Sequence, residues 1–583
     1  MQLSQLCVED VLLDCVASDR FLGAQMAFTR QRTGNRDTAK RRQEAEAVLS
    51  RVSSIPLPLD ARAQLVESMV NSKLLFDTSV APLSKRELQR WRSKIVAAVW
   101  GNGAPARCLE LVFTLLCRGH ATDPLQASIY RIISAAKRLL SRHEHLMGQW
   151  VSLMNITVQA LVDMPGANIN THGPVARFVW AIKKLGWEVL DPVTFRTSDG
   201  SEINLLEIEE GLLQHLIRDD LRLMLWKEAA HRRPQLQGIE QGIDREATMK
   251  HANSLRGSDK RLMQTILVGG IDTRERKFVR RQAQHPMCLH CNQQVVETTG
   301  HIVSDCPAWQ PIRQNMDNQF FHEQLCPCVA LNGIIPEQPH YAANERLLEE
   351  MNETPNAHFA ANEACETWAD NRIVIFTDGA CKRNSHKRLR RAGCGIFFGP
   401  GHTMNMSLPV PGRQQSNQRA ELLAAIKAAE TDPRDIEIRS DSAYVVRGFM
   451  APSSWRMQVS RVNGDLWARV DALVTASPNR ILVTKVKGHA TWRDVAQQNV
   501  SYSDKVGNAE ADRLARAGAD QHASVLHLEQ SSQRRIAKTR QYHKCLLRIM
   551  KARARALDAL PEYITAPPHH FGHFARNVRR RLQ

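Results

Sequence analysis

Four carboxylates spaced through residues 371–520 are the side chains of this sequence best suited to chemistry. Asp378 and Asp441 each follow a β-rich run, Glu421 lies in the first turn of a strong helical pattern, and Asp512 lies near the start of another. Two strand ends and two helices can bring four acids to one edge of a sheet. Carboxylates held together repel one another and need a cation, and their hard oxygens select Mg²⁺ or Mn²⁺. Two such ions can flank a scissile phosphate, where one activates water and the other stabilises the leaving oxygen.

A second reactive set, three cysteines and a histidine, lies earlier in the chain with the spacing C-x2-C-x9-H-x4-C. Thiolate and imidazole donors suit tetrahedral Zn²⁺, and four protein ligands leave no open position for a substrate. The spacing therefore predicts a structural zinc site. His285 and His290 are nearby competitors for the histidine position, and a chance grouping of the four residues is the alternative. The expected ligands are Cys288, Cys291, His301 and Cys306.

The segments that must position the four acids alternate between strand and helix patterns, which indicates an α/β domain. Helical patterns open at Ser416 and at Gly507, immediately before Glu421 and Asp512. The strand patterns are Arg372–Thr377, Gly393–Phe398, Asp435–Arg439 and Ile481–Val486.

The residues before this domain have a mostly helical pattern. Ser84 and Glu87 form a capping box, which predicts a helix that runs to about Trp100 and stops at Gly101. The prolines and polar residues of 333–370 are typical of a linker. Further helices are expected at about 107–117, 125–142, 145–162 and 203–231.

The positive charge of the chain is concentrated at its C-terminal end. The formal net charge is +18 over 583 residues, and residues 1–370 carry −1, residues 371–520 carry +9 and residues 521–583 carry +10. A basic part on a neutral part favours a polyanion partner such as nucleic acid. A solvated basic surface with a loose tail is the alternative explanation.

The composition is that of an ordinary globular protein, with 43% hydrophobic and 24% charged residues. No apolar run approaches the roughly 18 residues of a membrane helix, so no membrane partner is expected. The first residues carry acids where an export signal would carry bases, so we expect a nuclear or cytoplasmic protein that is not secreted. The 13 cysteines are then expected to be reduced thiols or metal ligands.

The acid-bearing segments resemble the type 1 ribonuclease H family. The resemblance covers about 150 residues and is specific in order and spacing. The matching elements are Thr377-Asp378-Gly379-Ala380, Asn417-Gln-Arg-Ala-Glu421, Ser440-Asp441-Ser442-Ala-Tyr444, Asp465-Leu-Trp467, Lys487-Gly488-His489 and Gly507-Asn508-Ala-Glu-Ala-Asp512.

This resemblance implies an α/β ribonuclease H-like fold, a five-stranded mixed sheet flanked by helices. It implies cleavage of the RNA strand of RNA·DNA hybrids with Mg²⁺ or Mn²⁺ bound by the four acids. It also implies that His489 assists proton transfer or product release. The residues expected to contact nucleic acid are Asn417, Gln418, Trp467 and Lys487.

Two departures from the family pattern stand out. His489 and Asp512 are separated by 23 positions where the family has about ten, and the nearby Asp504 and Glu510 compete for the role of fourth carboxylate. Residues 382–391 hold six Lys and Arg in place of a Gly-rich hairpin. This basic stretch either contacts phosphates or is a solvated loop.

The first 370 residues resemble the end of a non-LTR retrotransposon polyprotein. Arg20–Gly23 resembles the strand after the polymerase aspartates of such reverse transcriptases, 53–100 resembles their helical thumb, and the cysteine–histidine cluster resembles the zinc segment before their ribonuclease H domain. No Tyr/Phe-x-Asp-Asp motif is present, so we expect no DNA synthesis by this chain.

The sequence thus predicts an ordered series of segments that ends in the nuclease domain. The last of them, a basic helical tail, is expected to bind phosphates, to act as a nuclear address or to be a solvated helix. The expected segments are a reverse-transcriptase palm remnant (1–50), a helical thumb or connection-like region (51–280), a zinc-knuckle segment (281–332), a linker (333–370), the ribonuclease H domain (371–520) and the tail (521–583).

Two alternatives to an active ribonuclease H remain at the level of sequence. One is a catalytically silent, nucleic-acid-binding remnant of a retroelement, which the complete acid set argues against. The other is a DNA strand-transfer enzyme on the same fold, which gives no reason for the Arg-Ala-Glu and Lys-Gly-His motifs.

Overall fold

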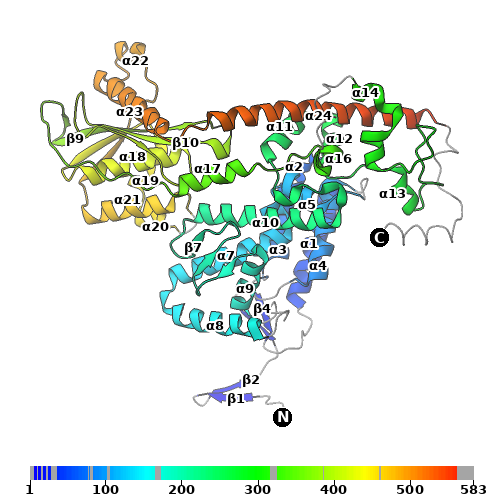
Figure 1. Cartoon of the computed structure of the whole chain (residues 1–583). Coiled ribbons are helices and arrows are strands. Elements are labelled where there is room, and N and C mark those ends of the chain that lie inside the picture. Colours follow the sequence, from blue (N-terminus) through cyan, green and yellow to red (C-terminus); the bar gives the residue numbers. More distant parts are fainter. Residues whose placement is uncertain are drawn as a thin grey trace. The chain divides into compact units, whose positions relative to one another are not determined.

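The apolar run from Ile373 to Phe376 makes β9 (Arg372–Lys382) the central strand of a mixed sheet in the computed structural model of the chain (Figure 1). The strand order is β11-β10-β9-β12-β13, in which β9, β12 and β13 are parallel and β10 is antiparallel to both of its neighbours, β9 and β11. The predicted five-stranded mixed sheet is confirmed, and a short sixth strand, β8, pairs with the start of β9. The remaining strands are β8 (Thr367–Ala369), β10 (Arg391–Phe397), β11 (Met406–Pro409), β12 (Ile436–Ser440) and β13 (Ile481–Lys485).

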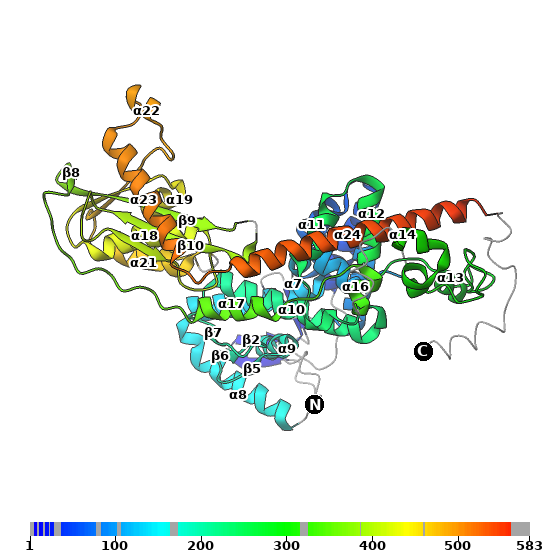
Figure 2. The same cartoon turned by 45° about the horizontal axis from the view of Figure 1, so that its top comes forward.

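Helices cover both faces of this sheet because successive side chains of β9 point to opposite sides. Ile373 and Ile375 belong to the core shared with α18 (Asn417–Thr431), α19 (Ala443–Met450) and α21 (Gly464–Ala476). Val374 and Phe376 pack with Ala511 of α23 (Tyr502–Asp520) on the other side (Figure 2). The domain is therefore a three-layer α/β structure.

The approach of α23 to the sheet depends on two glycines of β10. A Cβ atom built on Gly393 or Gly395 would lie 2.0 Å from a backbone atom of α23, far inside van der Waals contact. Any side chain at these positions would push the helix off the sheet, and α23 carries Asp512. The Gly-Cys-Gly sequence of β10 therefore sets the depth at which this helix lies.

The structure describes residues 36–560 except 77, 79–82, 102–105, 164–172, 315–324, 385 and 459–460. Before residue 36 it describes two short hairpins, β1 (Gln5–Val8) with β2 (Val11–Asp14) and β3 (Ser18–Phe21) with β4 (Ala24–Ala27). The chain divides into two units: one holds residues 1–206, 216–337 and 535–583, and the other holds 207–215 and 338–534. We call them the helical unit and the sheet unit.

The helical unit contains the helices predicted before residue 280. The predicted capping box is confirmed: Ser84 caps α4, which ends at Trp100 before Gly101 at φ +98°. The palm boundary expected at residue 50 falls inside α1, and the expected 203–231 helix begins only at Glu210, after strand β7. Leu22 and Gly23 of the polymerase-like stretch lie outside the described residues.

The elements of the helical unit are mainly helices joined by short turns. Three short strands form a small antiparallel sheet between α9 and α10, and α10 extends into the sheet unit at its first turns. The helices and strands are α1 (Arg36–Ser54), α2 (Leu59–Leu65), α3 (Asn71–Leu74), α4 (Lys85–Trp100), α5 (Leu109–Leu111), α6 (Gly119–Thr122), α7 (Pro124–Arg142), α8 (Met147–Asp163), α9 (Pro174–Leu185), β5 (Glu188–Val189), β6 (Thr194–Arg196), β7 (Glu202–Asn204), α10 (Glu210–Arg232), α11 (Arg245–Ser254), α12 (Gly257–Leu267), α13 (Arg274–Val279), α14 (Gln310–Gln314) and α16 (Pro327–Asn332).

The segment 333–370 is not a free linker. It contains α17 (Pro339–Glu349), in which Tyr341 is buried together with Leu389, Val525 and Leu528. The prolines and polar residues that resembled a linker lie at the start of this helix and in the extended segment after it. The packed Tyr341 makes the helix part of the sheet unit.

The basic segment after residue 520 is likewise packed against a core and is not a loose tail. It forms one helix, α24 (Leu526–Asp558), and the side chains of Tyr542, Leu546 and Met550 are buried in the core of the helical unit. Their spacing of four residues gives the helix an apolar face beneath its basic one. Residues 561–583, with Arg579–Arg581, lie outside the described residues.

None of the helices described in the structure is long and apolar enough to cross a lipid bilayer.

Candidate active site and metal centres

Three of the four predicted acids meet at one place on the sheet. Asp378, Glu421 and Asp441 each offer a carboxylate oxygen, and these oxygens lie within 4.8 Å of one another. Asp378 comes from β9, Glu421 from the second turn of α18, and Asp441 directly follows β12. We call this group the acid cluster.

The register of β9 and β12 explains why Asp378 and Asp441 are neighbours. The last residue pair between the two strands is Thr377 with Ser440, so the two aspartates follow at the next position on each chain. Asp378 was expected at a strand end, but β9 continues to Lys382 beside β10. Of the two strands, only β12 ends at the acid cluster, whereas Asp378 lies within β9.

Hydrogen bonds from two nearby side chains hold the carboxylate of Glu421. Ser442 Oγ donates to Glu421 Oε2 at 2.5 Å, and Asn417 Nδ2 donates to Oε1 at 2.6 Å. Helix α18 begins at Asn417 after the cap Ser416, which places Glu421 one turn later than the sequence pattern predicted. Both oxygens of Glu421 thus have fixed directions.

The electrostatics of the cluster favour a bound cation. Burial, and then the charges of Asp441, Asp512 and Glu421, raise the pKa of Asp378 to about 8. Burial, and then Asp441, also raise the pKa of Glu421. A divalent ion beside these carboxylates would offset both their burial and their repulsion. Three converging oxygen donors of this kind fit Mg²⁺ or Mn²⁺.

Asp512 lies near the cluster but outside the group of converging oxygens. It contributes to the raised pKa of Asp378, and its own carboxylate is paired with Arg516 at 2.7 Å. Its helix begins at Tyr502, so Asp512 lies in the third turn rather than the first. The competing acids have other partners: Asp504 pairs with Arg439, and Glu510 pairs with Arg513.

The predicted Lys-Gly-His segment follows β13 at the side of Asp441. A Cβ atom at Gly488 would lie 2.6 Å from Asp441 Oδ2, so any other residue there would displace the Asp441 carboxylate. His489 is exposed, with its backbone in the left-handed region at φ +49°. The exposed side chain of Lys487 is paired with Asp494 at 2.5 Å.

The expected nucleic-acid contacts divide into exposed and buried side chains. Asn417 and Gln418 are exposed at the start of α18. Trp467 has 0% exposure, and its indole N–H donates to the hydroxyl of Tyr444 at 2.8 Å. The expected contact between Trp467 and nucleic acid is therefore wrong, because the ring fills the core between α19 and α21. A Cβ atom at Gly448 would lie 1.8 Å from that ring.

The basic stretch 382–391 is largely used to hold neighbouring helices. Arg383 pairs with Glu529 of α24, and Arg388 pairs with Glu345 of α17. Lys382 pairs with Asp520 at the end of α23. These ion pairs favour a structural role over the phosphate contact that the sequence left open.

Three further residues support the site but were not predicted to belong to it. Ser442 stood in a matched motif without an assigned role, and its bond to Glu421 could not be read from spacing. Lys485 Nζ donates to the backbone oxygen of Asp441 at 2.9 Å. Arg439 joins β12 to α23 through Asp504 at 2.8 Å.

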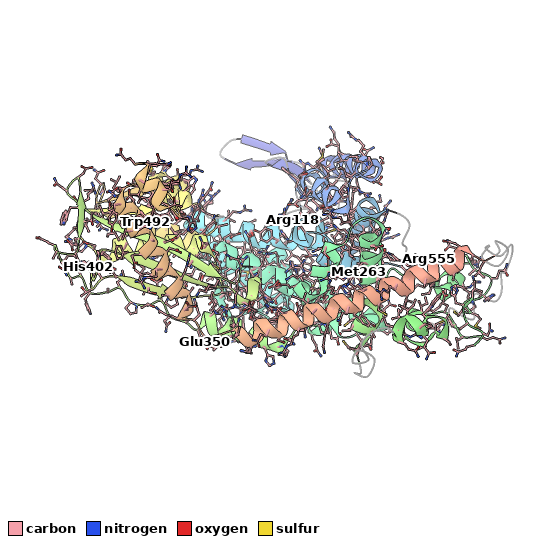
Figure 3. The ribbon with its side chains drawn as sticks, turned by 90° about the horizontal axis from the view of Figure 1, so that it is seen from above. Arg118, Met263, Glu350, His402, Trp492 and Arg555 are labelled. Carbon is pink, nitrogen blue, oxygen red and sulfur yellow. The ribbon has the colours of Figure 1, made fainter. Side chains whose placement is uncertain are left out.

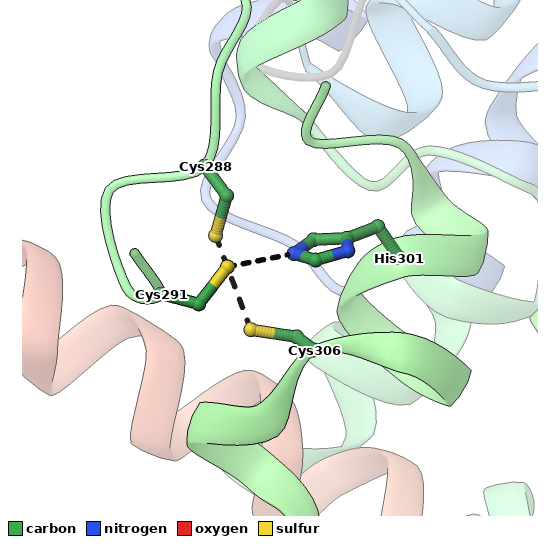
Figure 4. Close-up of side chains that lie close together, drawn as sticks. All are labelled: Cys288, Cys291, His301 and Cys306. Atoms are coloured by element: carbon green, nitrogen blue, oxygen red, sulfur yellow. Dashed lines mark hydrogen bonds between the residues drawn. The ribbon is translucent and has the colours of Figure 1, made fainter. Parts of the chain in front are cut away.

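The cysteine–histidine cluster forms in the helical unit as predicted from its spacing. Cys288, Cys291, His301 and Cys306 point toward one another, and their donor atoms lie within 4.8 Å of one another (Figure 4). A short hairpin carries the first two, since Cys288 N–H donates to Val295 O at 2.8 Å. The helical turn His301–Asp305 carries the histidine and leads to Cys306.

The distances within this cluster match the edges of a zinc tetrahedron. Zn–S bonds of about 2.3 Å separate two sulfurs by about 3.8 Å, and a Zn–N bond of about 2.1 Å gives a sulfur–nitrogen edge of about 3.6 Å. Cys288 Sγ and Cys306 Sγ are 3.9 Å apart, and Cys291 Sγ and His301 Nε2 are 3.4 Å apart. A disulfide would need about 2.05 Å between sulfurs. The four residues therefore fit Zn²⁺.

A buried acid beside this cluster excludes the competing histidine. Glu297 has 0% exposure and accepts hydrogen bonds from Arg553 at 2.6 Å and from the Arg274 backbone N–H at 2.9 Å. The ring of His290 faces Glu297 at 3.8 Å and Trp309, so it is turned away from the sulfurs. His285 is likewise absent from the converging group among the described residues.

Comparison with known proteins identifies a family for the part of the chain that contains the acid cluster. Residues 370–520 match the sequence model of the RNase H family. The chain is 34% identical to ribonuclease H1 of Rattus norvegicus over 161 residues, which are 26% of this chain and 50% of that protein. It is 35% identical over 154 residues to ribonuclease H of Schizosaccharomyces pombe, covering 26% and 54%.

The chain spans about half the length of these two relatives. A bacterial relative is covered almost completely: ribonuclease H of Verminephrobacter eiseniae is 34% identical over 161 residues, which are 26% of this chain and 92% of that protein. The matched segment contains the part of the sheet unit from β9 to α23, with the acid cluster inside it. Through this segment, the chain belongs to the ribonuclease H family.

Proposed function

We propose that the chain hydrolyses the RNA strand of RNA·DNA hybrids at the acid cluster. The observation that carries the proposal is the convergence of Asp378, Glu421 and Asp441 within 4.8 Å on a sheet whose sequence matches the family. Divalent ions held by these carboxylates supply an activated water and neutralise charge at the scissile phosphate. The nearby Asp512 would complete the set of metal ligands, as the sequence predicts.

Several side chains around the acid cluster contribute by orienting its carboxylates or by leaving room beside them. Ser442 and Asn417 direct the two oxygens of Glu421, and Gly488 allows the Lys-Gly-His loop to pass beside Asp441. The exposed His489 is proposed to assist proton transfer or product release. Exposed Asn417 and Gln418 are the proposed contacts to the nucleic acid, where a 2′-hydroxyl would identify RNA.

A cleavage assay on a labelled RNA·DNA hybrid tests the proposal. We expect Mg²⁺-dependent cutting of the RNA strand that Asp441→Asn reduces by at least about a thousandfold, because one of three converging ligands is lost. Glu510→Gln is the matched control, since this acid is paired with Arg513 on the outer side of α23. Equal activity of wild type and Asp441→Asn would refute the proposal. A folded but inactive wild type would indicate the silent remnant, and cutting and joining of duplex DNA would indicate strand transfer.

We also propose that Cys288, Cys291, His301 and Cys306 bind a structural Zn²⁺. All four positions of a tetrahedron are occupied by protein donors, which leaves no place for substrate. The ion would link the hairpin that carries Cys288 and Cys291 to the helical turn that carries His301 and leads to Cys306.

For the first 370 residues we propose an origin in a non-LTR retrotransposon polyprotein, in which the helical part helps to position nucleic acid. The proposal rests on the sequence resemblance and on the helices and zinc-type cluster found there. Salt-dependent binding of a hybrid by the full chain, weakened by charge changes in the helical unit, would support it.

A further inference from the structure

The longer connection between His489 and Asp512 builds an aromatic pair that the proposed function does not use. Trp492 opens α22 (Trp492–Ala496), and Tyr502 opens α23. Their side chains are 59% and 66% exposed, with ring centroids 5.9 Å apart and planes inclined by 38°. In Figures 1 and 2, α22 lies beyond the N-terminal end of α23, away from the sheet, and Figure 3 labels Trp492.

Ion pairs fix both ends of this connection next to the acid cluster. Asp494 accepts from Lys487 Nζ at 2.5 Å and from the Thr491 backbone N–H at 2.8 Å, and the bond from Lys487 lowers the pKa of Asp494. At the other end, Asp504 pairs with Arg439, two residues before Asp441. The aromatic pair is thus held on a supported arm, residues 491–506, rather than on a free loop.

These ion pairs also determine the charge that the arm presents to solvent. Both of its acids are paired with bases outside the arm: Asp494 with Lys487, and Asp504 with Arg439, which is shared with Glu437. Its own bases, Arg493 and Lys505, have no ion pair among the described residues. Lys505 Nζ lies 5.2 Å from the centre of the Trp492 ring. The arm therefore offers two aromatic faces beside the cationic side chains of Arg493 and Lys505.

This combination fits one kind of ligand, an unpaired nucleotide. A nucleobase stacks on an aromatic ring, and its phosphate is attracted by the neighbouring cation. Bases inside a hybrid duplex already stack on each other and cannot use such a platform, whereas bases in a single-stranded extension can. The tryptophan follows His489 by only three residues, so the platform belongs to the same end of the sheet as the acid cluster.

We propose that Trp492 and Tyr502 stack on an unpaired base next to the hybrid, so that the chain prefers junctions between hybrid and single strand. The preference deepens the proposed ribonuclease H function and rests on it for the identity of the substrate. The cationic side chains Arg493 and Lys505 would hold the phosphates of the same unpaired strand.

Binding of two substrates to the full chain tests this preference. The chain would carry Asp441→Asn so that the substrate is not consumed, and affinities would be measured for a blunt hybrid and for the same hybrid with a six-nucleotide single-stranded extension. We expect the extended hybrid to bind about tenfold more tightly, and Trp492→Ala or Tyr502→Ala to bring this ratio close to one. Trp492→Phe should retain most of it, because an aromatic face remains.

Trp368→Ala is the matched control, since Trp368 is 50% exposed on β8 of the same unit. It should leave the ratio unchanged. The stacking proposal would be wrong if the chain with Trp492 and Tyr502 intact bound the extended and blunt hybrids equally well. It would also be wrong if the ratio of the two affinities were the same with and without Trp492, even if the hybrid is cleaved. A ratio that depends on Trp492, found together with no hybrid cleavage by the chain that retains Asp441, would instead keep the platform and refute the nuclease.

Discussion

Ser442 joins two functions in one hydroxyl group. Its oxygen accepts the Val445 backbone N–H at 3.3 Å and so caps α19, while its hydrogen is donated to Glu421 at 2.5 Å. The start of a helix after Asp441 is thereby tied to the direction of another carboxylate of the acid cluster. This residue follows Asp441 directly in sequence, so the two adjacent positions serve the same site in different ways.

We predict that Ser442→Ala lowers hybrid cleavage about tenfold and stability by about 1 kcal/mol, the usual value of a lost cap. Ser84→Ala removes a cap of the same kind from α4 of the helical unit, where Ser84 bonds to no carboxylate of the cluster. It should cost similar stability without loss of activity. Cleavage rates and urea unfolding of both variants would separate the two effects, and an unchanged rate for Ser442→Ala would contradict the orienting role.

The raised pKa of Asp378 predicts an unusual pH dependence of stability. Its pKa is about 8 in the folded, cation-free protein and 3.8 as the ordinary value, so folding is favoured while the group is protonated. This contribution is complete below about pH 4 and is lost as the pH rises to about 8. Relative to Asp378→Asn, the wild type should lose on the order of a few kcal/mol across this range, since one pKa unit corresponds to about 1.4 kcal/mol.

Thermal unfolding from pH 4 to 8 in Mg²⁺-free buffer would measure this difference. Added Mg²⁺ at pH 8 should stabilise the wild type more than Asp378→Asn. If the stabilities of the two proteins changed with pH in parallel, the pKa of Asp378 would not be raised by burial and the neighbouring acids.

Removal of zinc should destabilise the helical unit selectively. The purified chain should contain about one zinc ion, and Cys288→Ser or Cys306→Ser should lose it together with the cooperative unfolding of that unit. Cys365→Ser is the matched control, because Cys365 lies in the sheet unit outside any converging group of donors among the described residues. Elemental analysis with calorimetry would test this, and a full complement of zinc in Cys306→Ser would contradict the ligand set.

Arg553 and Lys551 lie two residues apart on α24 but should respond differently to substitution. Arg553→Met leaves Glu297 buried without its charge partner and should cost about 3–5 kcal/mol. Lys551→Met removes only a half-exposed pair with Asp259 and should cost about 0–1 kcal/mol. Urea unfolding would compare them, and adding Glu297→Gln to Arg553→Met should recover part of the loss.

The outer face of α24 retains basic residues that have no ion pair among the described residues, including Arg540, Lys544 and Arg548. Together with burial, Arg540 and Lys544 lower the pKa of the neighbouring His251. If this face binds phosphates, changing the three to Gln should reduce the slope of log affinity against log salt by about 2–3. Exposed bases elsewhere in the helical unit, Arg142, Lys183 and Lys184, provide a control triple that should leave the slope unchanged.

Sequence alone was sufficient where the determinant is local. The capping box at Ser84, the mixed order of strands and helices after residue 371, and the two sets of ligand residues could all be named from the sequence. The structure brings together the four cysteine and histidine donors and three of the four acids. Local hydrogen bonding and side-chain periodicity carry the helix caps and the order of elements, because each involves residues only a few positions apart. The acids were found from the order of the motifs along the chain.

The tertiary structure decided what depends on distant partners. Only packing could reveal that Trp467 fills the core, that Tyr341 makes a proline-rich segment part of the sheet unit, and that α24 buries an apolar face under its basic one. Likewise, the charge of Arg553 could not be distinguished from that of Lys544 until Glu297, 256 residues earlier, was found beside it. Residue types and spacing determine which chemistry is available, whereas the burial and pairing of each group arise from contacts between segments that are remote in sequence.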